Sequence, residues 1–129
     1  MKTMRFIIAA FLSVYLLSSI PKVAKAEDPL KVGPDIYKLL FENDRVRVME
    51  IDFKPGAKIA EHSHPDHMLY VTSSGTLRIS HPDGKSVDVT PNVGDVLWTD
   101  AETHWAENIG TTEVKAVIVE LKEPKPASK

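Results

Sequence analysis

The chain has 129 residues, with 16 Lys and Arg, 18 Asp and Glu, five His and no Cys. This length fits one small domain with a single core and leaves no room for a separate cofactor domain. The lack of Cys excludes disulfides, thiolate metal ligands, thiol catalysis and a lipid-anchored N-terminal Cys. Any nitrogen or sulfur ligand for a metal must therefore come from His or from the four Met.

Residues 1–26 have the pattern of a secretory signal peptide. Lys2 and Arg5 precede an apolar run over 6–17, and Ala24-Lys25-Ala26 is a small-x-small cleavage site before Glu27. The alternative is an uncleaved N-terminal anchor, although the run is shorter than the about 20 residues that a membrane-spanning helix needs. We expect a secreted or periplasmic protein that keeps no stable membrane anchor after cleavage.

Cleavage would change the charge of the chain. Residues 1–26 hold four basic side chains and no acid, so the remainder carries 12 basic against 18 acidic side chains, a net charge of −6 with His neutral. An acidic domain without basic clusters argues against nucleic acid or anionic lipid as a partner.

After residue 26 the chain has short runs of strand-forming residues separated by turns, and no long helical pattern. Turn signals such as Asn43-Asp44, Pro55-Gly56 and Asp83-Gly84 separate these runs. We expect strands over 36–41, 46–50, 58–64, 68–72, 76–80, 86–90, 96–99, 103–106 and 114–121. This spacing predicts an all-β, antiparallel sandwich or barrel over 27–121, followed by a disordered tail, 122–129, that contains two Pro.

The expected last strand, 114–121, is apolar on both faces. Val114, Ala116 and Ile118 alternate with Val117, Val119 and Leu121, whereas an outer strand with one wet face needs only one apolar side. The strand therefore lies centrally or meets a second subunit in a homodimer. Strong β propensity in a modestly exposed sheet is a further explanation.

His62 and His64 are two residues apart on an expected strand, so their side chains leave the same face. Two neighbouring imidazoles on an inward face are hard to explain as core packing, because each needs hydrogen-bond partners. A divalent metal ion would satisfy both lone pairs at once. The pair therefore indicates a metal site.

At this point the residues resemble the cupin superfamily. Gly56, five residues and then His62-x-His64, closed by Gly75, resembles the first cupin motif, and Gly94-Asp95 with His104 and Asn108 resembles the second. The resemblance covers about 41–121 and is typical of a small single-domain cupin. It implies a double-sheet jelly-roll β-barrel that holds a divalent metal (Zn, Cu, Fe, Ni or Mn) through His62, His64 and His104.

The motifs depart from the family pattern in two places. Family members usually carry a Glu four or five residues after the second His, where this chain has Met68 and Leu69. His67 is the candidate to fill that gap as a fourth ligand; the alternatives are a proton shuttle and a bystander. The second motif also has Asp100 and Glu102 where Pro and Gly are usual, with one residue fewer before His104.

The resemblance implies a metal pocket for a small molecule more firmly than it implies a reaction. One hypothesis is a metal-dependent dioxygenase, isomerase or lyase that chelates a diketone, a hydroxy acid or an enol. In that enzyme His67 or Tyr70 would move the proton, although Tyr70 is also explained as an ordinary strand aromatic. The other hypotheses are a non-catalytic periplasmic barrel that binds a metal or small ligand, and a structural barrel with an empty or vestigial site. His81 is expected at the surface, and Asn108 in a turn.

Overall fold

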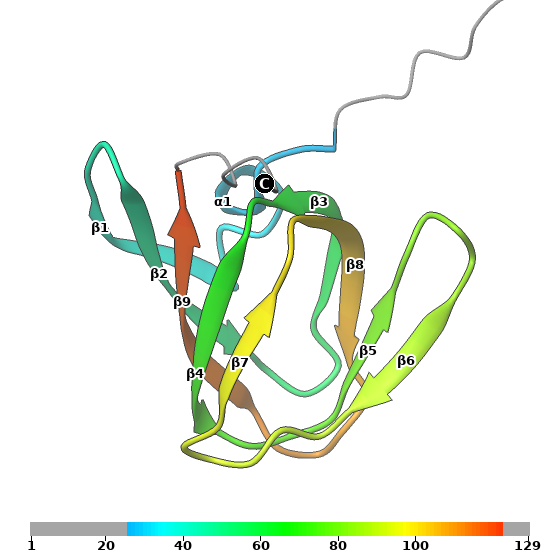
Figure 1. Ribbon diagram of the computed structural model, residues 1–129. Coiled ribbons are helices and arrows are strands. Elements are labelled where there is room, and N and C mark those ends of the chain that lie inside the picture. Colours follow the sequence, from blue (N-terminus) through cyan, green and yellow to red (C-terminus); the bar gives the residue numbers. More distant parts are fainter. Residues whose placement is uncertain (1–25, 123–129) are drawn as a thin grey trace, which may run out of the picture.

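The computed structural model describes residues 26–122, and these form an almost wholly antiparallel β structure (Figure 1). The predicted signal peptide, apart from Ala26, and all but the first residue of the predicted tail lie outside the described residues. Nine strands follow one short helix: α1 (Pro29–Val32), β1 (Tyr37–Glu42), β2 (Val46–Phe53), β3 (Lys58–His64), β4 (His67–Ser73), β5 (Leu77–Ser80), β6 (Ser86–Val89), β7 (Val96–Thr99), β8 (Glu102–Asn108) and β9 (Val114–Leu121).

The strands form two sheets, one with the order β1-β2-β9-β4-β7 and the other with the order β3-β8-β5-β6. Every pairing between these strands is antiparallel. The predicted double-sheet jelly roll is therefore confirmed. The sheets do not close into a barrel, however, because β7 and β6 end their sheets without pairing with each other.

Helix α1 is the one element that the strand pattern did not predict. Asp28 caps it, since its side chain accepts a hydrogen bond from the backbone N of Leu30, and Pro29 occupies the first turn. Four residues are too few to show helical periodicity. The helix lies against β3 (Figure 1), and the described chain before it pairs there too, because Ser63 N donates to Glu27 O.

Strand β9 lies at the centre of the five-stranded sheet, between β2 and β4. Its inward residues, Val114, Ala116, Ile118 and Glu120, are buried, while the alternate ones are half-buried. The central position is one of the three expected explanations for an apolar pattern on both faces. It needs no second subunit.

The apolar core lies between the two sheets. Met49, Phe53 and Ile118 are among its most buried side chains, and Ile59 and Ala106 contribute from the four-stranded sheet. Among residues 26–122, no helix has the length and apolar character needed to cross a membrane.

Candidate metal centre

Strand β3 presents His62 and His64 to the interior because of a β-bulge. The register with β8 shifts between Ile59 and His62, so that Ala60 and Glu61 are both exposed and the inward pattern resumes at His62. Bulges often re-aim side chains next to functional sites. His62 and His64 are then buried on one face, as the spacing predicted.

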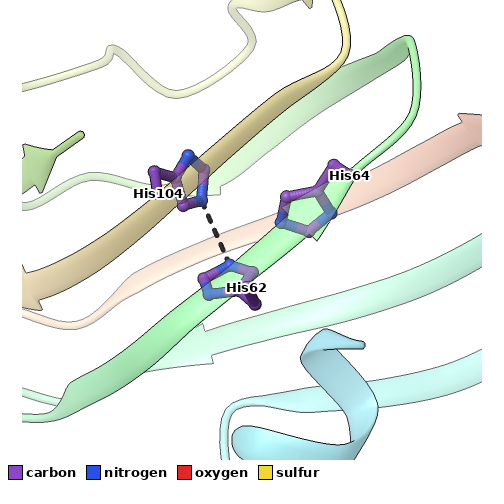
Figure 2. A group of neighbouring side chains, drawn as sticks. All are labelled: His62, His64 and His104. Atoms are coloured by element: carbon purple, nitrogen blue, oxygen red, sulfur yellow. Dashed lines mark hydrogen bonds between the residues drawn. The ribbon is translucent and has the colours of Figure 1, made fainter. Parts of the chain in front are cut away.

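Strand β8 brings His104 to the same place. His62 and His104 are register partners across β3 and β8, and their Nε2 atoms lie 3.1 Å apart (Figure 2). His64 completes a group of three buried histidines whose ligand atoms all lie within 4.8 Å of one another. The predicted trio from the two motifs is thus assembled on one sheet.

The Nδ1 atoms of His62, of His64 and of the neighbouring His67 are held by oxygen atoms. Ala60 O lies 2.8 Å from Nδ1 of His62, and Pro65 O lies 2.8 Å from Nδ1 of His67. Since a carbonyl only accepts, Nδ1 must be the donor, and a neutral ring then has its lone pair on Nε2. Nδ1 of His64 lies 2.6 Å from Oε1 of Glu120, which imposes the same tautomer when Glu120 is ionised. This arrangement is typical of metal-binding histidines.

Glu120 is itself held by a cation. Its Oε2 lies 2.7 Å from Arg47, and Arg47 also pairs with Asp28 beside α1. With one oxygen on His64 and the other on Arg47, Glu120 orients a histidine and is not placed to be a ligand. A chain of contacts therefore runs from exposed Asp28 to the buried cluster.

His104 is held less completely. Its Nδ1 lies 2.9 Å from Oε1 of Glu102, but the two are not aligned as a hydrogen bond, and this buried nitrogen has no other hydrogen-bond partner among the described residues. The other oxygen of Glu102 lies 4.0 Å from Nδ1 of His81. Glu102 thus stands between two histidines.

Burial disfavours the charged form of His62 and of His67. It lowers the pKa of His62 to about 4, with a smaller contribution from the neighbouring His104 and His64, and it lowers the pKa of His67 in the same direction. Burial alone would raise the pKa of Glu120, but hydrogen bonds with His64 and Arg47 outweigh it and hold that pKa below its usual value. The surroundings therefore favour the neutral form of His62 and His67 and the ionised form of Glu120.

The donor set fits a divalent metal ion. Two nitrogens that each lie 2.0–2.1 Å from one ion are about 2.9–3.4 Å apart, and the 3.1 Å between the Nε2 atoms of His62 and His104 falls within that range. Without a metal, Nε2 of His62, whose proton is on Nδ1, accepts a hydrogen bond from Nε2 of His104 at that distance. A cation bound by His62, His64 and His104 would take the place of this hydrogen bond.

The structure also places the remaining site candidates. His67, at the start of β4, is buried with its ring centroid 5.0 Å from that of His64, but it is not part of the compact group of three. Asn108 was expected in a turn but is the buried last residue of β8, and its side-chain amide donates to Phe53 O and Thr112 O. His81 is only partly exposed and lies beside Glu102, nearer to the cluster than its turn position indicated.

Tyr70 is not brought to the cluster. It is 45% exposed, since β4 turns His67 and Val71 inward and Tyr70 to the outer face of the sheet. Because successive side chains of a strand point to opposite faces, Tyr70, three residues after His67, leaves the opposite face of β4. Of the two explanations given for Tyr70, the ordinary strand aromatic fits its place on the outer face, and the role in proton transfer does not.

Sequence reasoning missed four residues around the cluster: Tyr37, Arg47, Glu102 and Glu120. The Tyr37 hydroxyl is 3.5 Å from Nε2 of His64, and burial raises the pKa of this phenol, which stays protonated. Glu120 did leave a signal, because it is the one acid in the inward series of β9. Nothing in the sequence pairs Tyr37 or Arg47 with a histidine.

The cluster opens into a cavity of about 510 Å³ between the two sheets. His64, His67 and His104 line it together with His81 and Glu102, and most of the other lining side chains are apolar. Its volume lies within the range of small-molecule sites, about 300–1,000 Å³. The arrangement could bind a small molecule beside a metal.

Comparison with known proteins agrees with this fold. The chain is similar to a cupin domain from Bordetella pertussis Tohama I (29% identity over 68% of this chain and 93% of that one, TM-score 0.63). It has the fold of a Klebsiella pneumoniae protein with a double-stranded β-helix domain (24%, 67% and 76%, TM-score 0.56) and of the polyketide cyclase RemF from Streptomyces resistomycificus (22%, 70% and 66%, TM-score 0.52). No curated protein matches the chain at a significant level. The cupin domain model matches residues 49–120, and the chain therefore belongs to the cupin family.

Proposed function

We propose that this cupin is an exported, metal-dependent enzyme that acts on a small organic molecule. The observation that carries the proposal is the convergence of His62, His64 and His104 beside a cavity. Nδ1 of His62 and Nδ1 of His64 are each held by an oxygen acceptor. A bound divalent ion would act as a Lewis acid on a substrate oxygen. The proposed reaction is that of a dioxygenase, an isomerase or a lyase, and the proposal does not choose among these three types.

The chain's own residues would prepare the site for that chemistry. Glu120 keeps the lone pair of His64 on Nε2, and Ala60 O does the same for His62. His67, whose Nε2 is left unprotonated by the bond to Pro65 O, is proposed as a fourth ligand or as the group that moves a proton. The Tyr37 hydroxyl is a second proton donor near His64.

Metal content tests the first part of this proposal. Protein recovered from the periplasm of a host that expresses the full chain should contain one divalent ion per chain, and a His62→Ala, His64→Ala double variant should contain none. Because nitrogen-rich sites filled outside the cytoplasm favour Cu or Zn over Fe and Mn, we expect Cu or Zn. Full occupancy in the double variant would contradict the site, and predominant Fe would contradict the order of metals.

Turnover tests the second part. The metal-loaded protein should convert at least one member of a panel of ketones, diketones and enols, and the double variant should not. Failure with Fe, Zn, Cu, Ni and Mn in turn would leave the alternative, a non-catalytic barrel that binds a metal or small ligand. One observation favours that alternative: Glu120 and Glu102 both face histidines, so neither carboxylate is free to act as a base.

Export and self-association complete the proposal. Cleavage after Ala26 would leave Glu27 at the N-terminus, beside β3, and N-terminal sequencing of the exported protein tests it. A homodimer would use the outer face of the five-stranded sheet, where one register row crosses every strand with apolar side chains: Phe41, Val48, Val119, Met68 and Trp98. Sedimentation should give a dimer that Trp98→Glu dissociates, while the exposed loop variant Val93→Glu does not.

A further inference from the structure

The cavity beside the cluster has mostly apolar walls and a small polar region at the histidines. Phe53, Leu69, Ile79, Leu97 and Ile118 are representative of its apolar lining, which both sheets supply. The polar groups are few, and the titratable ones are the histidines, Tyr37 and Glu102. A ligand would therefore exchange water for hydrocarbon over most of its surface and meet polar atoms at the cluster.

The charges of the lining side chains further limit which ligands the cavity can bind. Within residues 26–122, no Lys or Arg lines the cavity. The carboxyl group of Glu102 does line it, 2.9 Å from Nδ1 of His104. Apart from the metal ion of the proposed function, an organic anion would gain no cationic partner for the hydration that it loses, and it would face this carboxylate. A sugar would bury several hydroxyl groups against apolar walls.

The cavity opens between β6 and β7. Val87 and Val89 of β6 and Leu97 of β7 line it and are also substantially exposed, which places them at its mouth. Each of these two strands is an edge strand of its sheet (Figure 1). A small molecule has a route into the cavity past these apolar side chains.

We propose that the ligand is a neutral, mainly apolar small molecule that presents one or two adjacent oxygens, such as a phenol, ketone or diketone, to the histidine cluster. This inference rests on the proposed function, since it concerns the same site. The proposed ligand class is narrower than the set of substrates considered from the sequence, because it excludes hydroxy acids.

Equilibrium dialysis of the Zn-loaded protein with three probes tests the proposal. The probes are 2-naphthol, 2-naphthoate, which has the same apolar body with a carboxylate, and glucuronate. We expect 2-naphthol to bind at least about tenfold more tightly than 2-naphthoate, given the loss of hydration by an unpaired anion, and glucuronate not to bind. Equal or tighter binding of either anion would overturn the ligand class.

Two neighbouring residues of β7 provide a matched pair of variants. Leu97 lines the cavity and is 41% exposed, whereas Val96 is 64% exposed and does not line it. Leu97→Asp should weaken 2-naphthol binding at least about tenfold, and Val96→Asp should leave it within about twofold. Equal loss in both variants, or loss in Val96→Asp alone, would place the probe on the outer face and overturn the proposal.

Zn content measured on the same samples separates the two proposals. Protein that binds Zn but shows no preference for 2-naphthol refutes the ligand class and leaves the metal site intact. Protein that binds no Zn but still prefers 2-naphthol, with the Leu97→Asp effect, refutes the metal-dependent function and supports the ligand class.

Discussion

Oε1 of Glu120 lies 2.6 Å from Nδ1 of His64, and both side chains are almost completely buried. The two residues are 56 positions apart in the chain and belong to different sheets. Such a carboxylate fixes the ring orientation and tautomer of a metal-binding histidine and raises its basicity. The contact therefore ties the central strand of one sheet to the metal site on the other.

Replacing this carboxylate should weaken metal binding without removing a ligand. Glu120→Gln keeps the size of the side chain but loses the charge that holds the proton on Nδ1, so we expect metal affinity to fall about 10–100-fold. Competition with a chelator of known affinity measures the change. Glu50→Gln, at an exposed position of β2, is the matched control and should bind as the unchanged protein does. Equal affinity in both variants would show that Glu120 does not act on the site.

Arg47 should matter more for folding than an exposed arginine does. It is 15% exposed and balances the charge of Glu120, so Arg47→Met leaves a buried carboxylate without its cation. We expect a loss of about 3–5 kcal/mol in the free energy of unfolding, measured by urea denaturation. Arg78→Met removes an exposed, solvent-screened pair with Asp88 and should change the free energy of unfolding much less. Similar losses in the two variants would mean that the buried pair has no special role.

The strand pattern and the first two ligands could be predicted from local sequence. Strands β3, β7 and β9 have the predicted bounds, because turn residues mark their ends and alternation marks their faces. The His62-x-His64 spacing also correctly predicted that the two side chains lie on the same face of the strand. These features depend on neighbours in sequence, which is why they could be read directly.

The rest of the site depends on contacts between distant strands. The face of β4 could not be derived from β3, because the turn at Pro65-Asp66 resets the alternation. For this reason the sequence left both explanations of Tyr70 open, a pocket residue and an ordinary strand aromatic. Glu120 and Arg47 reach the cluster only because β9 and β2 are adjacent in the other sheet. A single sequence carries no signal for that pairing beyond the presence of an acid in an apolar strand.

The metal-free protein should lose stability as the pH falls from about 6.5 to 4. Burial lowers the pKa of His62 to about 4, against an ordinary value of 6.5. Between these values the unfolded chain binds more protons than the folded one, so acid favours unfolding; above 6.5 His62 contributes nothing to this dependence. The effect for one group is at most on the order of 3 kcal/mol.

Urea denaturation with a chelator present, at steps between pH 7.5 and 4.5, measures this dependence. The carboxyl groups of Glu102 and Glu120, whose pKa values are lowered, contribute stability that is lost only at a still lower pH. A His62→Gln variant has no proton to gain at this position and should show a shallower fall. A free energy of unfolding that stays constant over this range would contradict the prediction.

His67 provides the last prediction, because it stands beside the compact trio on another strand. If its free Nε2 is a fourth ligand, His67→Ala should keep one metal ion per chain, held by His62, His64 and His104, but bind it more weakly. His81→Ala, which changes the other histidine near the cavity, should alter neither quantity. Elemental analysis gives the stoichiometry, and chelator competition gives the affinity. Unchanged affinity with lost turnover would instead assign the proton transfer to His67, and no change in either would leave it without a role.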